Sequence, residues 1–278
     1  YWLDVEAEGG KGMAERSAPP GPCGAPATSF VGTVRREEDL FYGAKVPAGE
    51  EHWYWQRLLA PGTAGLPVDV FDPVPGDGTM RVALLGYTSD EVSPDHHVRI
   101  RLNGCSLAEA QWDGQELYLL ESPIPGSCLQ EGENLLELEA LGDTGARVDI
   151  ILVDWFEIDY QRHFMARDET LAFRGQGGSY AVGGFSDAPV WLFDVSDPLD
   201  TALIAGAVVE NAESGYTLSF CDDEPSGHSY LAVSQAGLRN PASLTAVSPS
   251  VDLRSPTNQA DYVVITHESF LEAVQPLV

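Results

Sequence analysis

Apolar and polar residues alternate in several short runs between His97 and Tyr160. In the run 98–102, Val, Ile and Leu alternate with two arginines, and Asn103-Gly104, a strong signal for a tight β-hairpin, follows directly. Further along, Leu136 and Leu138 alternate with glutamates. The five strand-like runs of this stretch are separated by Gly, Pro and Asn, and this pattern predicts an antiparallel β-sandwich.

An aromatic run, Trp53-Tyr54-Trp55, lies upstream of that stretch. Alternation along a strand would place Trp53 and Trp55 on one face and Tyr54 on the other. A sugar-binding surface stacks such rings on pyranose faces, whereas a sandwich core buries them at a gain of about 1.5–3 kcal/mol per large side chain. Trp53, Trp55 and Trp112 are therefore the candidate carbohydrate-binding residues, and burial in the core is the competing interpretation.

A second series of short apolar runs follows Tyr160 and predicts a smaller β-sandwich. Turn residues separate the runs, and at Ser196-Asp197-Pro198 we expect the Asp side chain to bond local backbone while Pro fixes φ. The candidate strands are 171–173, 180–182, 190–195, 203–209, 216–220 and 230–233.

The last stretch of the chain has a different pattern. Residues 261–266 include a continuous apolar run, typical of a strand buried on both faces of a parallel sheet, and residues 267–274 have helical spacing. One strand and one helix cannot bury their own apolar faces. We therefore interpret this stretch as the first strand–helix unit of a truncated α/β domain.

The patterns together predict a mainly β chain in four parts. These are an irregular N-terminal segment over 1–28, a β-sandwich over 29–163, a small β-sandwich over 164–256 and the start of the α/β domain over 257–278.

The chain is strongly acidic, with 43 Asp and Glu against 15 Lys and Arg and a formal charge of -28 over 278 residues. This balance argues against nucleic acid and anionic lipid as partners, because both require a basic patch. No apolar run is long enough to span a membrane. An acidic surface suits calcium or a cationic partner, although simple solvation also explains it.

Calcium is the one cofactor that the sequence suggests. Asp222, Asp223 and Glu224 form a candidate calcium loop through their carboxylate oxygens, with a loop of solvated acids as the alternative. Adjacent histidines on a strand point to opposite faces, so His96 and His97 are not expected to share an ion.

The four cysteines are Cys23, Cys105, Cys128 and Cys221, and three pairings are open. Cys105 and Cys128 flank strands of one sheet segment, an arrangement that allows a bridge between them. Cysteine usage is compatible with an exported protein. A reactive thiolate needs an electropositive setting, and Cys221 is followed by three acidic residues, so we assign no catalytic cysteine.

Asp154–Arg162, Val190–Pro198 and Thr257–Leu277 follow one another along the chain. In this order they resemble three segments of the gingipain-like cysteine peptidases. Asp154–Arg162 resembles the D-x-x-E-I-x-Y-x-R segment ahead of the catalytic domain, and Val190–Pro198 resembles the W-D-V-T-D-P stretch that follows. Thr257–Leu277 is similar to the first strand and helix of the peptidase domain. The turns at 103–104, 112–114 and 132–134 resemble those of galactose-binding-like jelly rolls.

The resemblance implies a non-catalytic accessory region of a gingipain-like cysteine endopeptidase, secreted or on the cell surface of a bacterium. Its partner would be a downstream peptidase domain of the same chain, beside which it packs and to which it presents substrate. The family's Cys and His belong to the catalytic domain, so no catalytic residue is carried over. The alternatives are a carbohydrate-binding module and a calcium-binding adhesive surface protein, with glycan or protein ligands.

Overall fold

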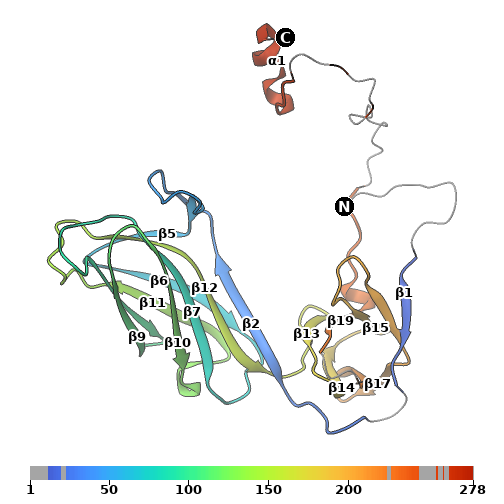
Figure 1. Cartoon of the computed structure of the whole chain (residues 1–278). Helices are drawn as coiled ribbons and strands as arrows, with labels where there is room; N and C mark the ends of the chain where they lie inside the picture. The colour runs from blue at the N-terminus through green and yellow to red at the C-terminus, as the bar shows by residue number, and fades with distance from the viewer. Residues whose placement is uncertain are drawn as a thin grey trace. The chain divides into compact units, whose positions relative to one another are not determined.

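The computed structural model describes residues 12–19, 23–223, 227–243, 255, 259 and 263–277. The chain divides into two compact units, Tyr1–Leu238 and Arg239–Val278. The first unit consists of β-strands (Figure 1), which confirms the predicted mainly β class. The strands surround two large hydrophobic cores, and a small third cluster contains Tyr54, Leu85 and Leu152. Among the described residues, no helix has the length and apolar character that a membrane span requires.

The first core belongs to a jelly-roll sandwich of two antiparallel sheets. One sheet has the order β10-β7-β12-β2, with β5 also paired to β12, and the other has the order β6-β11-β8-β9. The strands are β2 (Phe30–Glu37), β5 (Gln56–Leu59), β6 (Gly62–Val70), β7 (Gly78–Gly86), β8 (His96–Leu102), β9 (Cys105–Trp112), β10 (Leu117–Ile124), β11 (Gly132–Ala140) and β12 (Ile150–Arg162), with a 3₁₀ turn at Gly126–Cys128.

The predicted hairpin at Asn103-Gly104 joins β8 to β9. Both residues have positive φ, 51° and 80°, as the tight hairpin turn requires. The Asn103 side chain donates hydrogen bonds to the Cys128 carbonyl (2.9 Å) and to Oδ1 of Asn134 (2.7 Å), and it accepts one from the Leu135 amide (2.9 Å). One polar side chain thus ties the hairpin to β11.

Strand β11 follows the alternation that its sequence predicts. Leu136 and Leu138 are fully buried in the first core, whereas the preceding residue, Leu135, is 42% exposed. The period-2 pattern therefore identified the core face of this strand correctly.

Strand β12 is the longest strand in the described part of the chain and has a β-bulge in the middle. It pairs with β7 on one side, and on the other with β5 over 150–153 and then with β2 over 155–162. The register with β7 shifts between Val153 and Phe156, so Asp154 and Trp155 together oppose a single residue. The bulge therefore lies where β12 changes its neighbour from β5 to β2.

The second core lies in a smaller β body, as predicted. Its sheets have the orders β1-β16-β15-β19-β13 and β14-β18-β17. The strands are β1 (Ala14–Ser17), β13 (Thr170–Arg174), β14 (Gly178–Phe185), β15 (Val190–Asp194), β16 (Ala202–Ala205), β17 (Val208–Ala212), β18 (Gly215–Asp222) and β19 (Ser229–Ser234), followed by a 3₁₀ turn at Gln235–Gly237. In the predicted turn after β15, the Asp197 side chain accepts a hydrogen bond from the Leu199 amide (2.9 Å).

Two sequence predictions for this body are wrong. The single strand expected over 203–209 is two strands in different sheets, because Gly206, with φ of 86°, turns the chain between β16 and β17. The segment 1–28 is not wholly irregular, since β1 pairs in parallel with β16.

All four cysteines are paired. Cys105 is bridged to Cys128 within the jelly roll, with 5.9 Å between their Cα atoms, and Cys23 is bridged to Cys221 across 198 residues of sequence, with 5.7 Å between theirs. This pairing is one of the three that the sequence left open.

The second unit contains short helical turns at Glu268–Phe270, Leu271–Val274 (α1) and Gln275–Leu277. The predicted helix is therefore present in shortened form. The predicted strand is wrong for residues 263–266, which are irregular, with Val263 and Ile265 72% and 95% exposed. A strand needs hydrogen-bonded neighbours, and the described residues of this unit supply none. Residues 261 and 262 lie outside the described residues.

The adjacent histidines of β8 do point to different partners. His96 is fully buried, and its Nδ1 lies 2.6 Å from Asp149 Oδ1. Its Nε2 lies 3.1 and 3.2 Å from the carbonyls of Thr88 and Gly114. His97 Nδ1 instead contacts Asp143 at 2.8 Å.

Both ring nitrogens of His96 therefore face acceptors, an arrangement that favours the imidazolium ion. Burial lowers the pKa of His96, but the hydrogen bond and charge of Asp149, with the charge of Asp95, outweigh it, so the pKa is raised above its ordinary value of 6.5.

A raised pKa in the folded state means that charged His96 stabilises the fold below about pH 6.5, and that this contribution is lost as the pH rises through the folded pKa. We predict that His96→Gln lowers the free energy of unfolding more at about pH 6 than at about pH 9. Urea denaturation at the two pH values measures the difference, with exposed His163→Gln as the control. An equal loss at both values would contradict the charged state.

Candidate functional site

The three tryptophans predicted to bind carbohydrate lie in different environments. Trp53 is 48% exposed, whereas Trp55 and Trp112 are only 8% exposed. Trp55 stacks on Phe156 with ring centroids 5.8 Å apart, and Trp112 stacks on Tyr118 at 4.9 Å. Trp55 and Trp112 are therefore core residues, and the prediction that they form a sugar platform is wrong.

The prediction that Trp55 shares an exposed face with Trp53 is wrong for a local reason. Strand β4 (Trp53–Tyr54) ends before Trp55, and the chain bends there before β5 begins. The alternation that groups Trp53 with Trp55 stops at the bend, so Tyr54 and Trp55 are both buried and Trp53 alone faces solvent.

The predicted calcium loop does not present three free carboxylates. Asp222 is buried, and its carboxylate accepts a hydrogen bond from the Tyr230 hydroxyl (2.6 Å) and lies 3.3 Å from Nδ1 of His228. Asp223 is exposed, and Glu224 lies outside the described residues. Asp222 is therefore used in holding β18 to β19.

An exposed aromatic cluster forms on the small hairpin of β3 (Phe41–Tyr42) and β4. Tyr42 pairs with Trp53 across the hairpin, and their rings meet edge-on at 5.2 Å. Tyr42 is 52% exposed and stacks on His52 at 5.3 Å. Tyr54, on the other face of the hairpin, is buried against Leu85. One side of the hairpin is thus anchored and the other presents three rings to solvent.

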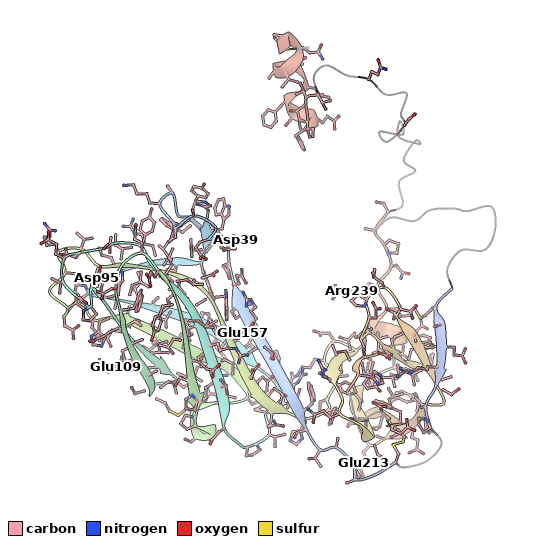
Figure 2. All side chains as sticks on the ribbon, in the orientation of Figure 1. Asp39, Asp95, Glu109, Glu157, Glu213 and Arg239 are labelled. Carbon is pink, nitrogen blue, oxygen red and sulfur yellow. A yellow bond between two sulfur atoms is a disulfide. The ribbon has the colours of Figure 1, made fainter. Side chains whose placement is uncertain are left out.

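Three carboxylates gather beside this hairpin: Glu37 at the end of β2, Glu51 in the loop before β4, and Asp154 at the bulge of β12. One oxygen from each lies within 4.8 Å of the others, and among the described residues this is the only such group found. Figure 2 labels Asp39, two residues after Glu37, at this end of the jelly roll.

The strands explain why these three residues meet. Glu37 pairs with Trp155 in the β2–β12 register, so it lies next to Asp154. Glu51 is held by the Tyr54 hydroxyl, which donates a hydrogen bond to the Glu51 carbonyl (2.9 Å). The anchored hairpin thereby holds the Glu51 loop beside the end of β2.

Asp154 has the most unusual environment of the group. It is 8% exposed, and its buried Oδ1 has no hydrogen-bond partner. Burial first, and then the negative charges of Glu51 and Glu37, raise its pKa to about 7. Burial also raises the pKa of Glu51, with Glu37 and Asp39 adding to the effect.

One cation lies beside the group. The Arg35 guanidinium contacts Glu37 Oε2 at 2.7 Å and Glu157 at 3.0 Å, and it lies over the Trp155 ring at 4.0 Å. Figure 2 labels Glu157 on β12, on the same stretch that pairs with β2. Arg35 thus balances part of the negative charge and leaves the rest uncompensated.

The sequence analysis does not find this site, because Glu37, Glu51 and Asp154 come from three separate segments of the chain. The available signal was Asp154, the one charged residue in the otherwise apolar run Ile150–Phe156. A carboxylate inside a core strand requires a partner.

The comparisons with known proteins give a fold and no family. A scan against models of protein families finds no match, and a search of curated proteins finds none either. Among solved structures, the crystal structure of dimeric latent PorU from Porphyromonas gingivalis aligns with a TM-score of 0.59 and 12% identity, over 80% of this chain. The alignment covers 22% of that chain, so this chain spans about a fifth of the PorU length.

Two carbohydrate-binding modules align over 46% of this chain. One is the CBM36-1 domain of a multidomain xylanase from the hindgut metagenome of Trinervitermes trinervoides (TM-score 0.30, 9% identity, 96% of that chain). The other is a CBM36 in complex with calcium and xylotriose (TM-score 0.31, 15% identity, 98% of that chain). Because these TM-scores are low, the PorU alignment alone bears on the fold.

The different positions of Trp53 and Trp55 can be tested by stability. We predict that Trp55→Ala lowers the free energy of unfolding by about 3–5 kcal/mol, because it leaves a cavity in the jelly-roll core. Trp53→Ala should change it by less than about 0.5 kcal/mol, because its ring lies on the surface. Urea denaturation of both variants measures the contrast, and equal losses would contradict the assignment.

Proposed function

We propose that this chain is a non-catalytic accessory region of a larger, secreted gingipain-like cysteine peptidase. The observation that carries the proposal is the PorU alignment, in which 80% of this chain matches 22% of a longer chain. The motif resemblance adds to it, because Asp154–Arg162 lies on the last strand of the jelly roll and Val190–Pro198 begins as β15 of the second body.

The cysteines support both parts of this proposal. All four are engaged in disulfides, so none of them offers a thiolate nucleophile. Two disulfides in one chain suit an oxidising compartment, and we place the protein outside the cell or on the surface of a bacterium. In this role the jelly roll and the second body pack beside a downstream peptidase domain and present its substrate.

The test is to read the coding DNA beyond Val278 and to express the longer product beside the 278-residue chain. We predict that the longer reading frame encodes a downstream α/β domain with a catalytic Cys and His. The longer product should hydrolyse peptides, and replacement of that Cys by Ala should abolish the activity. The 278-residue chain should not hydrolyse peptides. A reading frame without such a domain, or hydrolysis by the 278-residue chain itself, would overturn the proposal.

A second candidate function is carbohydrate binding at the β3–β4 hairpin. The specific observation is the exposed cluster of Tyr42, His52 and Trp53, since flat aromatic faces suit pyranose rings. Trp55 and Trp112 have no part in it, because both are buried.

For this function we predict glycan binding on an array that falls at least tenfold in Trp53→Ala. The loss corresponds to about 1.4 kcal/mol, within the range for one aromatic contact. Leu119→Ala, which removes an exposed apolar side chain from β10, serves as the matched control. Absence of binding to any glycan, or unchanged binding by the folded Trp53→Ala variant, would remove this candidate.

A further inference from the structure

We propose that Glu37, Glu51 and Asp154 bind one calcium ion where β2, the β3–β4 hairpin and β12 meet. This site is separate from the predicted Asp222 loop, and it does not depend on the accessory role or on glycan binding.

The spacing of the oxygens suits one large, hard cation. Calcium binds oxygens at about 2.3–2.6 Å, so two ligands of one ion lie up to about 5 Å apart. The three carboxylate oxygens fall within this limit, at 4.8 Å or less from one another. Three separate segments of the chain supply them, with Asp154 far from the other two in sequence, so the jelly-roll fold itself builds the group.

Asp154 provides the independent sign of a ligand. It is more than nine-tenths buried, and its Oδ1 has no hydrogen-bond donor. A buried carboxylate is unfavourable unless it is paired, neutralised or bound to a metal. The other two members of the group, Glu37 and Glu51, carry the same negative charge as Asp154. A bound cation would therefore offset both the cost of burying the Asp154 carboxylate and its repulsion from the two glutamates.

The net charge around the three carboxylates is negative enough to favour a divalent cation. Arg35 is the nearby cation, and its contacts with Glu37 are made to Oε2. Asp39 adds a fourth negative charge that acts on Glu51 and Asp154. Four carboxylates against one guanidinium leave a strongly negative site even with Arg35 in place.

The donor set favours calcium over other biological metals. All three ligands are carboxylates, which suit calcium and magnesium, whereas zinc prefers nitrogen and sulfur ligands. Glu37 and Glu51 are exposed, so water can complete the six to eight oxygens that calcium takes. Magnesium demands a near-ideal octahedron at shorter distances, which three side chains from separate segments meet less easily.

A bound ion would also fix the aromatic hairpin. Glu51 lies two residues before Trp53, and Glu37 and Asp154 belong to long strands of the sheet. The ion would thus connect the hairpin loop to the sheet through charged ligands.

The experiment uses the whole 278-residue chain, freed of metal with a chelator and titrated with CaCl₂, MgCl₂ or ZnCl₂ by calorimetry, with thermal unfolding in parallel. We expect one calcium per chain, a rise in the unfolding temperature with calcium, and weaker binding of magnesium and zinc. Asp154→Asn and Glu51→Gln should each weaken calcium binding at least tenfold. Glu213→Gln, at an exposed turn of the second body labelled in Figure 2, should bind as the wild type does.

Metal-free Asp154→Asn separates a ligand from a merely structural residue. Removal of a buried, unpartnered charge should leave its unfolding temperature equal to that of the metal-free wild type or higher, while the gain with calcium disappears. A lower temperature in both states would assign Asp154 a structural role and overturn the proposal.

The proposal is also overturned by the absence of wild-type binding up to about 1 mM calcium, the weak end for extracellular modules. Calcium binding by either ligand variant as tight as that of the wild type would overturn it too. If Asp154→Asn does not fold, Glu51→Gln decides, because Glu51 is exposed in a loop.

Discussion

The pairing of β12 with three neighbours is the constraint on which the rest of the jelly roll depends. Along its 13 residues, β12 is hydrogen-bonded to β7 on one side and to β5 and then β2 on the other. Apolar side chains of β12, including Ile151, Val153, Phe156 and Ile158, are fully buried in the core. A strand fixed on both edges and buried on its core face has one register.

The change of neighbour from β5 to β2 is what makes a site possible. A bulge at that point places Asp154 among groups that a regular strand would keep apart. The same geometry brings the end of β2 and the Glu51 loop to it, and the hairpin presents its aromatic rings beside them. The carboxylates and the rings thus depend on one irregularity in the sheet.

Sequence patterns predicted the architecture well wherever a local rule determined it. The Asn103-Gly104 turn follows from its φ requirement, and the burial of Leu136 and Leu138 follows from alternation on one sheet face. The split at Gly206 went unpredicted, because continuous apolar character does not reveal which sheet a strand joins. The prediction of a strand over 263–266 was wrong because apolar residues form a strand only where neighbouring strands can pair with them.

The site was much harder to predict than the fold. By sequence alternation alone Trp55 is equivalent to Trp53, but the chain bends after Tyr54 and directs Trp55 into the core. Glu37, Glu51 and Asp154 lie up to 117 positions apart in the sequence. No local sequence pattern predicts the β2–β12 register or the bulge that bring them together. A charged residue inside an apolar run was the one signal available, and it gives no indication of its partners.

Amide hydrogen exchange with and without calcium tests most directly whether the junction at the β12 bulge holds the hairpin. The Trp55 amide donates to the Val153 carbonyl, and the Gly43 amide donates to the His52 carbonyl, so these two amides report on the hairpin and its attachment. The account predicts that calcium slows the exchange of both at least tenfold, about 1.4 kcal/mol, while amides of β11 are unchanged. Exchange at Gly43 and Trp55 that is indifferent to calcium, or slowed equally in β11, would contradict it.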